Sequence, residues 1–241
     1  MDAETSDRVR VVRGRRETRE ADRSVTAAML DRTGRDGVPA FRAWTPHRQV
    51  AFGRRDSHAE RYDEARRAAE DRGFPPVERS VGGRAVAYTG TTTLAFAHTV
   101  PTADVRTGLD ARYEAATESV VEALRSVGVA ATPGEPPNSF CPGAHSVRAE
   151  GKLCGIAQRV RSDAALVSGV VVADDSAEIA AVLEPVYAAL DVPFDHETVG
   201  SVAESGGPSD PERTVRALES SFVGDAEWEV TDAAAFVSDD E

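Results

Sequence analysis

Apolar residues recur every three or four positions along several stretches of this chain, and this spacing predicts amphipathic helices. The clearest case is residues 109–127, where a glycine, Gly128, follows the last apolar position. The same reasoning predicts helices at residues 17–33, 58–73, 176–190 and 210–222, with an interruption of the fourth near Pro185.

Other stretches are short runs of Val, Ala, Phe and Thr bounded by glycine, proline or polar residues, which is typical of strands. Residues 145–150 and 152–160 predict a hairpin that turns at Glu150 and Gly151. Strands are also expected at residues 38–44, 48–53, 77–80, 85–88, 92–100 and 165–173. Hairpins combined with separated helices predict an α+β fold, with mixed or antiparallel sheets packed against helices.

Composition narrows the class of protein. Acidic residues outnumber basic ones 41 to 28, which gives a net charge of −13 and argues against a general nucleic-acid binder. An acid excess with almost no lysine is also typical of a halophilic protein, because the Debye length falls to about 3 Å at 1 M salt and surface acids then repel one another little. The alternative is an ordinary acidic protein from a GC-rich genome.

The distribution of apolar residues also bears on location. No apolar run approaches the roughly 20 residues that a membrane span needs, so no membrane association is expected. The first 20 residues lack the apolar centre of a signal peptide, which favours a cytoplasmic protein. The two cysteines, Cys141 and Cys154, are too few for a disulfide framework.

Three stretches carry candidate chemistry. In RSVGGRAVAYTG, residues 79–90, Gly82 and Gly83 would let backbone approach a ligand closely, and two arginines flank them, although a plain turn is the simpler interpretation. In EGKLCGIAQR, residues 150–159, Lys152 is the only lysine of the protein, by chance or because a compact ammonium is needed there.

The third stretch is the proline-rich loop of residues 133–143. Four prolines in eleven residues exclude a helix and an inner strand, so Cys141 lies in a stiff loop and is a candidate nucleophile. A zinc site built from Cys141, His145 and Cys154 would need a fourth ligand, and its spacing fits no familiar pattern. Cys154 itself is better explained as a small buried residue.

The order and spacing of these stretches resemble the catalytic domain of the biotin/lipoate protein ligase superfamily, over about residues 20–222. Within it, the chain resembles the branch of lipoate–protein ligases and cysteine-dependent octanoyl(lipoyl)transferases. RSVGGRAV is similar to the R-x-x-G-G-x-A-V stretch of that branch, EGKLCGIAQR to its G-K-x-x-G-x-A-Q signature, and SFCPGAHSV to the cysteine loop of its transferases. Glu78 and Tyr88 depart from the arginine and histidine common at these positions.

The resemblance implies a domain plan and a set of site residues. We expect a flexible N-terminal extension (residues 1–16), a lipoate ligase/transferase-like catalytic domain (17–225) and an acidic C-terminal tail (226–241). Two residues are expected to be catalytic: Cys141 would carry the acyl thioester, and Lys152 would donate to the acyl carbonyl. The expected substrate-binding residues are Arg79, Gly82, Gly83, Tyr88 and Gly155, and no metal site is expected. Lys152→Arg should leave folding almost unchanged and slow catalysis by about 10²–10³.

The function implied by the resemblance is an acyltransferase of lipoate metabolism. It would attach octanoyl or lipoyl groups to a lysine of lipoyl-domain proteins, such as glycine cleavage H protein or the E2 subunit of 2-oxoacid dehydrogenases, and acyl carrier protein is a further possible partner as acyl donor. No cofactor is required for this reaction. The alternatives are an ATP-dependent lipoate–protein ligase that uses ATP and Mg and proceeds through lipoyl-AMP, and an inactive module that only binds lipoyl domains.

Overall fold

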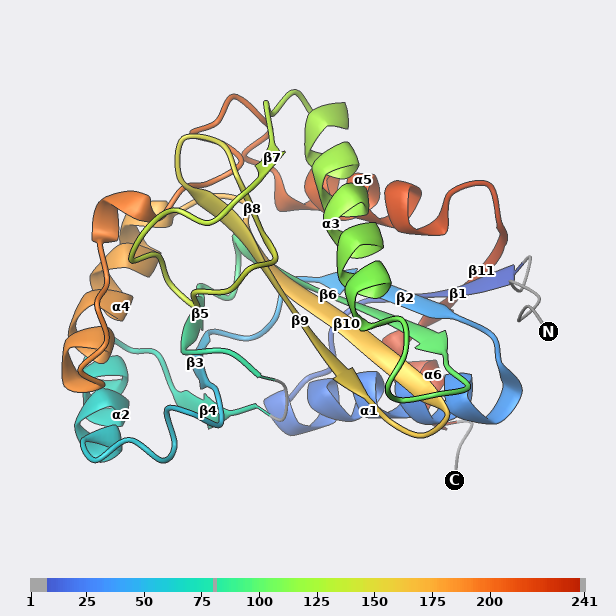
Figure 1. The fold of residues 1–241 in the computed structure, drawn as a ribbon, viewed down its shortest axis with the longest axis horizontal. Coiled ribbons are helices and arrows are strands. Elements are labelled where there is room, and N and C mark those ends of the chain that lie inside the picture. The colour runs from blue at the N-terminus through green and yellow to red at the C-terminus, as the bar shows by residue number, and fades with distance from the viewer. Residues whose placement is uncertain (1–7, 80–81, 239–241) are drawn as a thin grey trace.

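The computed structural model describes residues 8–79 and 82–238 of the 241-residue chain. Its centre is a large mixed sheet that crosses the whole molecule (Figure 1). The strands, in their order across this sheet, are β11 (Glu227–Asp232), β1 (Arg8–Arg13), β2 (Ala40–Trp44), β6 (Thr93–Pro101), β10 (Ala164–Val172), β9 (Lys152–Val160), β8 (Ser146–Arg148) and β7 (Thr132–Pro133).

A second, smaller sheet packs beside the large one, on the left of Figure 1. It consists of β4 (Pro76–Glu78), β3 (Gln49–Phe52) and β5 (Val86–Tyr88), and its apolar residues share one core with helices α2 (Tyr62–Glu70) and α4 (Ser176–Ala189). The same core reaches the large sheet through Ala95 and Val170. The small sheet therefore covers one end of one face of the large sheet.

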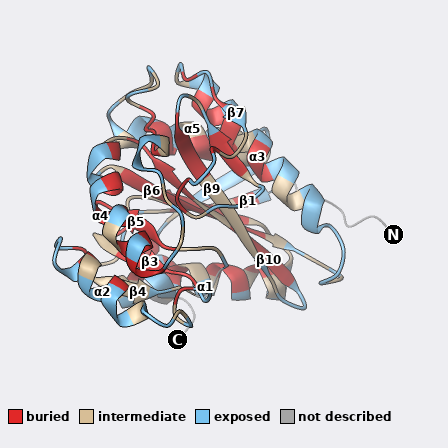
Figure 2. Cartoon of the chain, turned by 60° about the vertical axis from the view of Figure 1, so that its left-hand side comes forward, coloured by how far each residue is buried: buried red, intermediate tan, exposed pale blue. Residues whose placement is uncertain are grey.

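Four helices cover the rest of the large sheet. On one face, α3 (Leu109–Ser126) and α5 (Pro211–Val223) pack over residues such as Phe41, Phe96 and Val171. On the other face, α1 (Arg19–Asp36) and α6 (Ala233–Ser238) pack over Ala97 and Leu166. A short 3-10 helix, η1 (His196–Thr198), follows α4. The buried colouring in Figure 2 is concentrated on the strands between these layers.

Strand register places small side chains on the face shared by the small sheet and α1. Residues directly opposite one another in a sheet point to the same side. One row across β2, β6, β10 and β9 is Trp44, Ala95, Val170 and Gly155, and the next is Arg42, Ala97, Ser168 and Ala157. Alanine, glycine and serine fill little volume, so this face keeps a trough between the small sheet and α1.

The predicted α+β class is confirmed, and most predicted elements occur within a few residues of their expected bounds. Helix α1 begins after the N-cap Thr18, whose side chain accepts from the Ala21 amide, and ends at Gly37, which has a φ of 74°. The hairpin of β8 and β9 is antiparallel as expected. Among the described residues, no helix combines the length and the apolar composition that crossing a membrane would require.

Two predictions about the chain ends are wrong for the residues that the structure describes. Residues 8–13 form β1, paired in parallel with both β2 and β11, and Val11 and Val12 are fully buried there. Residues 227–238 form β11 and α6, which complete this edge of the sheet. The remainder of the expected extension and tail, residues 1–7 and 239–241, lies outside the described residues.

The predicted interruption near Pro185 is also wrong, because α4 continues through this residue. A proline inside a helix leaves the carbonyl four residues earlier without its usual amide donor. The carbonyl of Ala181 is that group, and the Arg72 side chain donates to it through Nε at 3.0 Å. A residue from the end of α2 thus replaces the hydrogen bond that Pro185 cannot make.

Candidate functional site

A pocket of about 1000 Å³ lies between the small sheet, α1 and the trough of the large sheet. The floor is formed by Ala95, Ala97, Gly155, Ala157 and Ser168, which belong to the two rows of small residues. Its walls include Arg79, Gly82, Gly83 and Tyr88 from the smaller sheet and its loop, and Cys141 from the proline-rich loop. The pocket therefore combines an apolar floor with polar and reactive groups at one end.

The Cys141 loop is held in an unusual backbone conformation. Cys141 has a φ of 44°, in the left-handed region that non-glycine residues seldom adopt. Its amide donates to the hydroxyl of Tyr187 at 2.6 Å, and this hydroxyl donates in turn to the carbonyl of Ala85 at 2.9 Å. Tyr187 is fully buried on α4, so it fastens the cysteine loop to the start of β5.

Arg79 faces the cysteine sulfur from the other side. Its Nη2 lies 3.2 Å from the Cys141 Sγ and also donates to the Arg84 carbonyl at 2.6 Å. Burial works to lower the pKa of Arg79, but the neighbouring Cys141 and Tyr88 more than offset this, and the pKa is raised above its ordinary value. The guanidinium stays charged and faces any negative charge that forms on sulfur.

Gly83 makes this approach possible. Its φ is 97°, and a Cβ at this position would lie 2.6 Å from Nη2 of Arg79 and 2.7 Å from Sγ of Cys141. Gly53 lets the backbone of the Gly83 loop approach closely, because a Cβ at position 53 would lie 1.8 Å from the Gly83 carbonyl oxygen. At the exposed Gly82, in contrast, a Cβ would meet no described atom within 4 Å. Only the second glycine of the pair is required by close packing.

The only lysine of the chain lies beneath the cysteine loop. Lys152 is 0% exposed and does not line the pocket within the described part of the chain. Its Nζ donates to the two carboxylate oxygens of Glu135 at 3.1 and 2.9 Å, to the Phe140 carbonyl at 2.8 Å and to the Cys141 carbonyl at 2.9 Å. These four acceptors surround an ammonium that has three protons.

The expected role of Lys152, donation to an acyl carbonyl, stays a prediction. Within the described chain, its ammonium donates to Glu135 and to the carbonyls of Phe140 and Cys141. The side chain anchors the carbonyls of residues 140 and 141 and is neutralised by Glu135, which also accepts from the Ser139 hydroxyl. Lys152 thus connects β9 to the loop that carries Cys141.

Tyr88 and Gly155 are placed as expected at the pocket. Burial raises the pKa of Tyr88 to about 12, so its hydroxyl is neutral at ordinary pH. Gly155 lies on the floor, and a Cβ there would come within 3.4 Å of the Lys152 Cε. Cys154 points to the opposite side of the sheet into the core, and burial raises the pKa of its thiol to about 12, as its assignment as a small buried residue anticipated.

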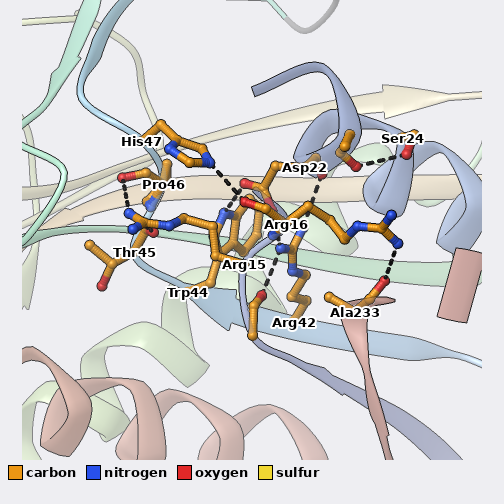
Figure 3. A network of polar contacts seen from close by, with 12 residues as sticks. Arg15, Arg16, Asp22, Ser24, Arg42, Trp44, Thr45, Pro46, His47 and Ala233 are labelled. Atoms are coloured by element: carbon orange, nitrogen blue, oxygen red, sulfur yellow. Dashed lines mark hydrogen bonds and ion pairs between the residues drawn. The ribbon is translucent and has the colours of Figure 1, made fainter. Parts of the chain in front are cut away.

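A buried network fixes the pocket wall formed by α1 and β2 (Figure 3). The Asp22 carboxylate accepts from Arg42, from Trp44 Nε1 at 2.9 Å and from the Arg16 amide at 3.1 Å. Burial lowers the pKa of Arg42, and the adjacent Asp22 acts against this shift. The Arg42 guanidinium lies 4.0 Å from the Trp44 ring centroid, so the indole is held in one orientation at the trough.

Comparison with protein families gives a match to the lipoyl protein ligase A/B catalytic domain over residues 22–222. The chain belongs to this family. The match includes the cysteine loop, the glycine pair and the floor of the trough.

The names of similar proteins include a transferase and ligases. The transferase is an octanoyl-[GcvH]:protein N-octanoyltransferase of Exiguobacterium sp., 32% identical over 120 residues, which are 49% of this chain and 42% of that protein. The chain is thus matched to less than half the length of this curated relative.

Solved structures that share the fold include two lipoate protein ligases. One is lipoate-protein ligase A bound with ATP, with a TM-score of 0.76, 19% identity and coverage of 96% of this chain and 93% of that chain. Another is the bi-partite lipoate protein ligase of Thermoplasma acidophilum, studied with its E2 lipoyl domain, with a TM-score of 0.70, 17% identity and coverage of 98% and 91%. At these identities the likeness concerns the fold.

Sequence reasoning brought together Cys141, Arg79, Gly83, Tyr88 and Gly155 but missed two residues of the same site. The Tyr187 hydroxyl accepts from the Cys141 amide, and the Glu135 carboxylate accepts from Lys152 beside the same loop. Glu135 lies in the same proline-rich loop as Cys141, six residues earlier, and this short separation could have indicated that the two lie at one site. Tyr187 lies 46 positions from Cys141 on a helix whose pattern indicated only packing.

Proposed function

We propose that this chain is a cysteine-dependent acyltransferase that moves octanoyl or lipoyl groups onto a lysine of lipoyl-domain proteins. The observation that carries the proposal is Cys141 itself. A thiol lies at the end of an apolar trough, 3.2 Å from a half-buried guanidinium, in a loop held by hydrogen bonds with Arg79, Tyr187 and Lys152. A ligase that activates its acid with ATP has no use for a nucleophile at this position.

The reaction has two steps. The Cys141 thiol gives up its proton and the sulfur attacks the acyl carbonyl of a donor. The bond between the acyl carbon and the donor nitrogen or sulfur breaks, a thioester forms, and the donor leaves with that proton. The amine of an acceptor lysine then attacks the thioester, the bond between acyl carbon and sulfur breaks, an amide forms, and the proton lost by the amine returns to the Cys141 sulfur. Arg79 balances the charge on sulfur at the start and at the end, and the trough holds the apolar chain.

The donor and the acceptor are proteins in this proposal. The name of the Exiguobacterium relative supports octanoyl-GcvH as the donor, and an acyl thioester on acyl carrier protein is the alternative. The lipoyl domain of E2 is supported as an acceptor by the Thermoplasma acidophilum system. No cofactor takes part in either step, whereas the ligase alternative would consume ATP with Mg. The acid excess further supports work in a salt-rich cytoplasm.

A transfer assay at high salt separates the candidates. Octanoyl-GcvH, octanoyl-acyl carrier protein, or octanoate with ATP and Mg is incubated with an apo E2 lipoyl domain, and the mass of the domain is measured. Acylation without ATP that is lost in Cys141→Ala and kept in Cys154→Ala supports the proposal. Acylation that needs octanoate and ATP and survives Cys141→Ala overturns it in favour of the ligase, and binding without product in all three arms indicates an inactive module.

A further inference from the structure

The charge around the pocket is opposite to the charge of the chain. Eight of the lining residues are arginines, and only Asp22 and Glu78 among the described lining residues are acidic. Both acids are engaged already, Asp22 by Arg42 and Trp44, and Glu78 by the Tyr62 hydroxyl at 3.2 Å. A protein with a net charge of −13 thus surrounds one opening with positive charge.

Four of these arginines, Arg23, Arg54, Arg55 and Arg159, form what we call the arginine collar. Each is exposed, and none of the four guanidinium groups makes an ion pair or hydrogen bond with another residue of the described ranges 8–79 and 82–238. Many arginines elsewhere are neutralised, such as Arg10 by Asp36, Arg13 by Glu219 and Arg48 by Glu178. Unpaired cations beside so many available acids leave a positive field at the opening.

The collar is spread over separate parts of the fold. Arg23 lies on α1, Arg54 and Arg55 follow β3, and Arg159 lies near the end of β9. Figure 1 shows β3 left of centre and the end of β9 near the lower centre, above α1 in this view. A small phosphate ligand needs donors that converge on one point, whereas exposed cations placed around a rim match a broad, negatively charged surface.

We propose that the arginine collar docks an acidic face of the acceptor protein and so guides its lysine to Cys141. This inference rests on the proposed function, because it names the partner surface for the same site. Rim charges of this kind act mainly on the association rate and on its dependence on salt. The collar would therefore set acceptor affinity without taking part in acyl chemistry.

The test measures docking and chemistry separately. The double variant Arg55→Glu/Arg159→Glu is compared with Arg213→Glu, which reverses an exposed arginine on α5 that does not line the pocket. Binding of an apo lipoyl domain of net negative charge is measured by titration at low and high salt. A second, neutralised version of this domain, in which Asp is replaced by Asn and Glu by Gln, is measured in the same way. Loading of Cys141 is measured with octanoyl-N-acetylcysteamine, a neutral thioester that needs no collar.

The proposal expects the double variant to bind the acidic domain about tenfold more weakly at low salt, with a flatter salt dependence and unchanged loading. Arg213→Glu should bind the acidic domain as the parent does. The neutralised domain should bind the parent and the double variant equally. Equal binding by parent and double variant overturns the collar, and so does a loss confined to ATP binding, which would indicate a nucleotide site. If the parent fails to load but binds the domain through the collar, the docking surface stands and the transferase function fails.

Discussion

The guanidinium of Arg79 lies 3.2 Å from the sulfur of Cys141, although the two residues are 62 positions apart in the chain. The first follows the smaller sheet and the second lies in a proline-rich loop before the β8–β9 hairpin. The contact between these two side chains links the smaller sheet to the cysteine loop at one end of the trough. Four groups maintain it: the glycine at position 83, the hydroxyl of Tyr187, the ammonium of Lys152 and the carboxylate of Glu135.

Gly83→Ala should disrupt this pair without unfolding the protein. The new Cβ would sit within 2.7 Å of both Arg79 and Cys141, and the positive φ adds strain, so we expect Cys141 acylation to slow by at least about tenfold. Gly82→Ala is the matched control, since a Cβ there meets no described atom within 4 Å. Single-turnover loading with an octanoyl thioester measures both. Equal rates for the two variants would show that Gly83 serves only a turn.

Lys152 should matter for stability as well as for activity. The structure changes the expectation that Lys152→Arg leaves folding untouched, because the ammonium is fully buried among four acceptors. Lys152→Met leaves Glu135 without its cation and should lower the free energy of unfolding by about 3–5 kcal/mol. Adding Glu135→Gln should recover part of this loss. Urea unfolding measures it, and a Lys152→Met variant as stable as the parent would contradict the anchoring role.

The trough predicts which acyl chains are accepted. Ala157 lies two residues beyond Gly155 along β9, about 7 Å farther from the cysteine loop, and its side chain forms part of the floor. Ala157→Leu should slow transfer of octanoyl groups by about tenfold or more and spare butyryl groups, which end before it. Ala115→Leu, on the exposed surface of α3, is the control. A uniform effect on both chain lengths would place the acyl chain elsewhere.

Acid should destabilise the fold partly through His98. This half-buried histidine packs against Phe41 and Phe222, and burial lowers its pKa to about 4. Between pH 6.5 and 4 the unfolded chain binds a proton that the folded chain does not, so stability falls as the pH falls. The contribution is on the order of 2–3 kcal/mol.

The measurement is urea unfolding of the parent and of His98→Phe at pH 7 and pH 4.5. The variant should lose less stability between these two pH values than the parent does. His196→Gln, at an exposed position, should behave like the parent. A parent and a His98→Phe variant with the same pH dependence would show that His98 is solvated.

Much of this arrangement could be predicted from the sequence, because local signals coincide with the structure. The family resemblance carried by the glycine pair, the proline-rich loop and the hairpin motif placed Arg79, Gly83, Cys141 and Gly155 at one site. Strand β1 was missed although valine and arginine nearly alternate through RVRVVR, residues 8–13. Its burial depends on pairing with β11, which lies more than 200 residues away.

The remaining differences come from tertiary contacts that leave no local pattern. Nothing near Tyr187 indicates that its hydroxyl reaches the Cys141 amide, and nothing near Arg72 indicates that it caps a carbonyl beside Pro185. The sequence singles out Lys152 as the only lysine, but it does not show which groups its ammonium contacts. Only the packed loop shows that it donates to Glu135 and two backbone carbonyls.

The most direct test of the account is the mass of the protein after incubation with an octanoyl donor and no acceptor. We predict the addition of one octanoyl group, located on the peptide that contains Cys141, removed by hydroxylamine and transferred when an apo lipoyl domain is added. Cys141→Ala should stay unmodified, and Cys154→Ala should behave like the parent. An unmodified parent that nevertheless acylates the lipoyl domain, or a Cys141→Ala variant with full transfer activity, would contradict the central claim.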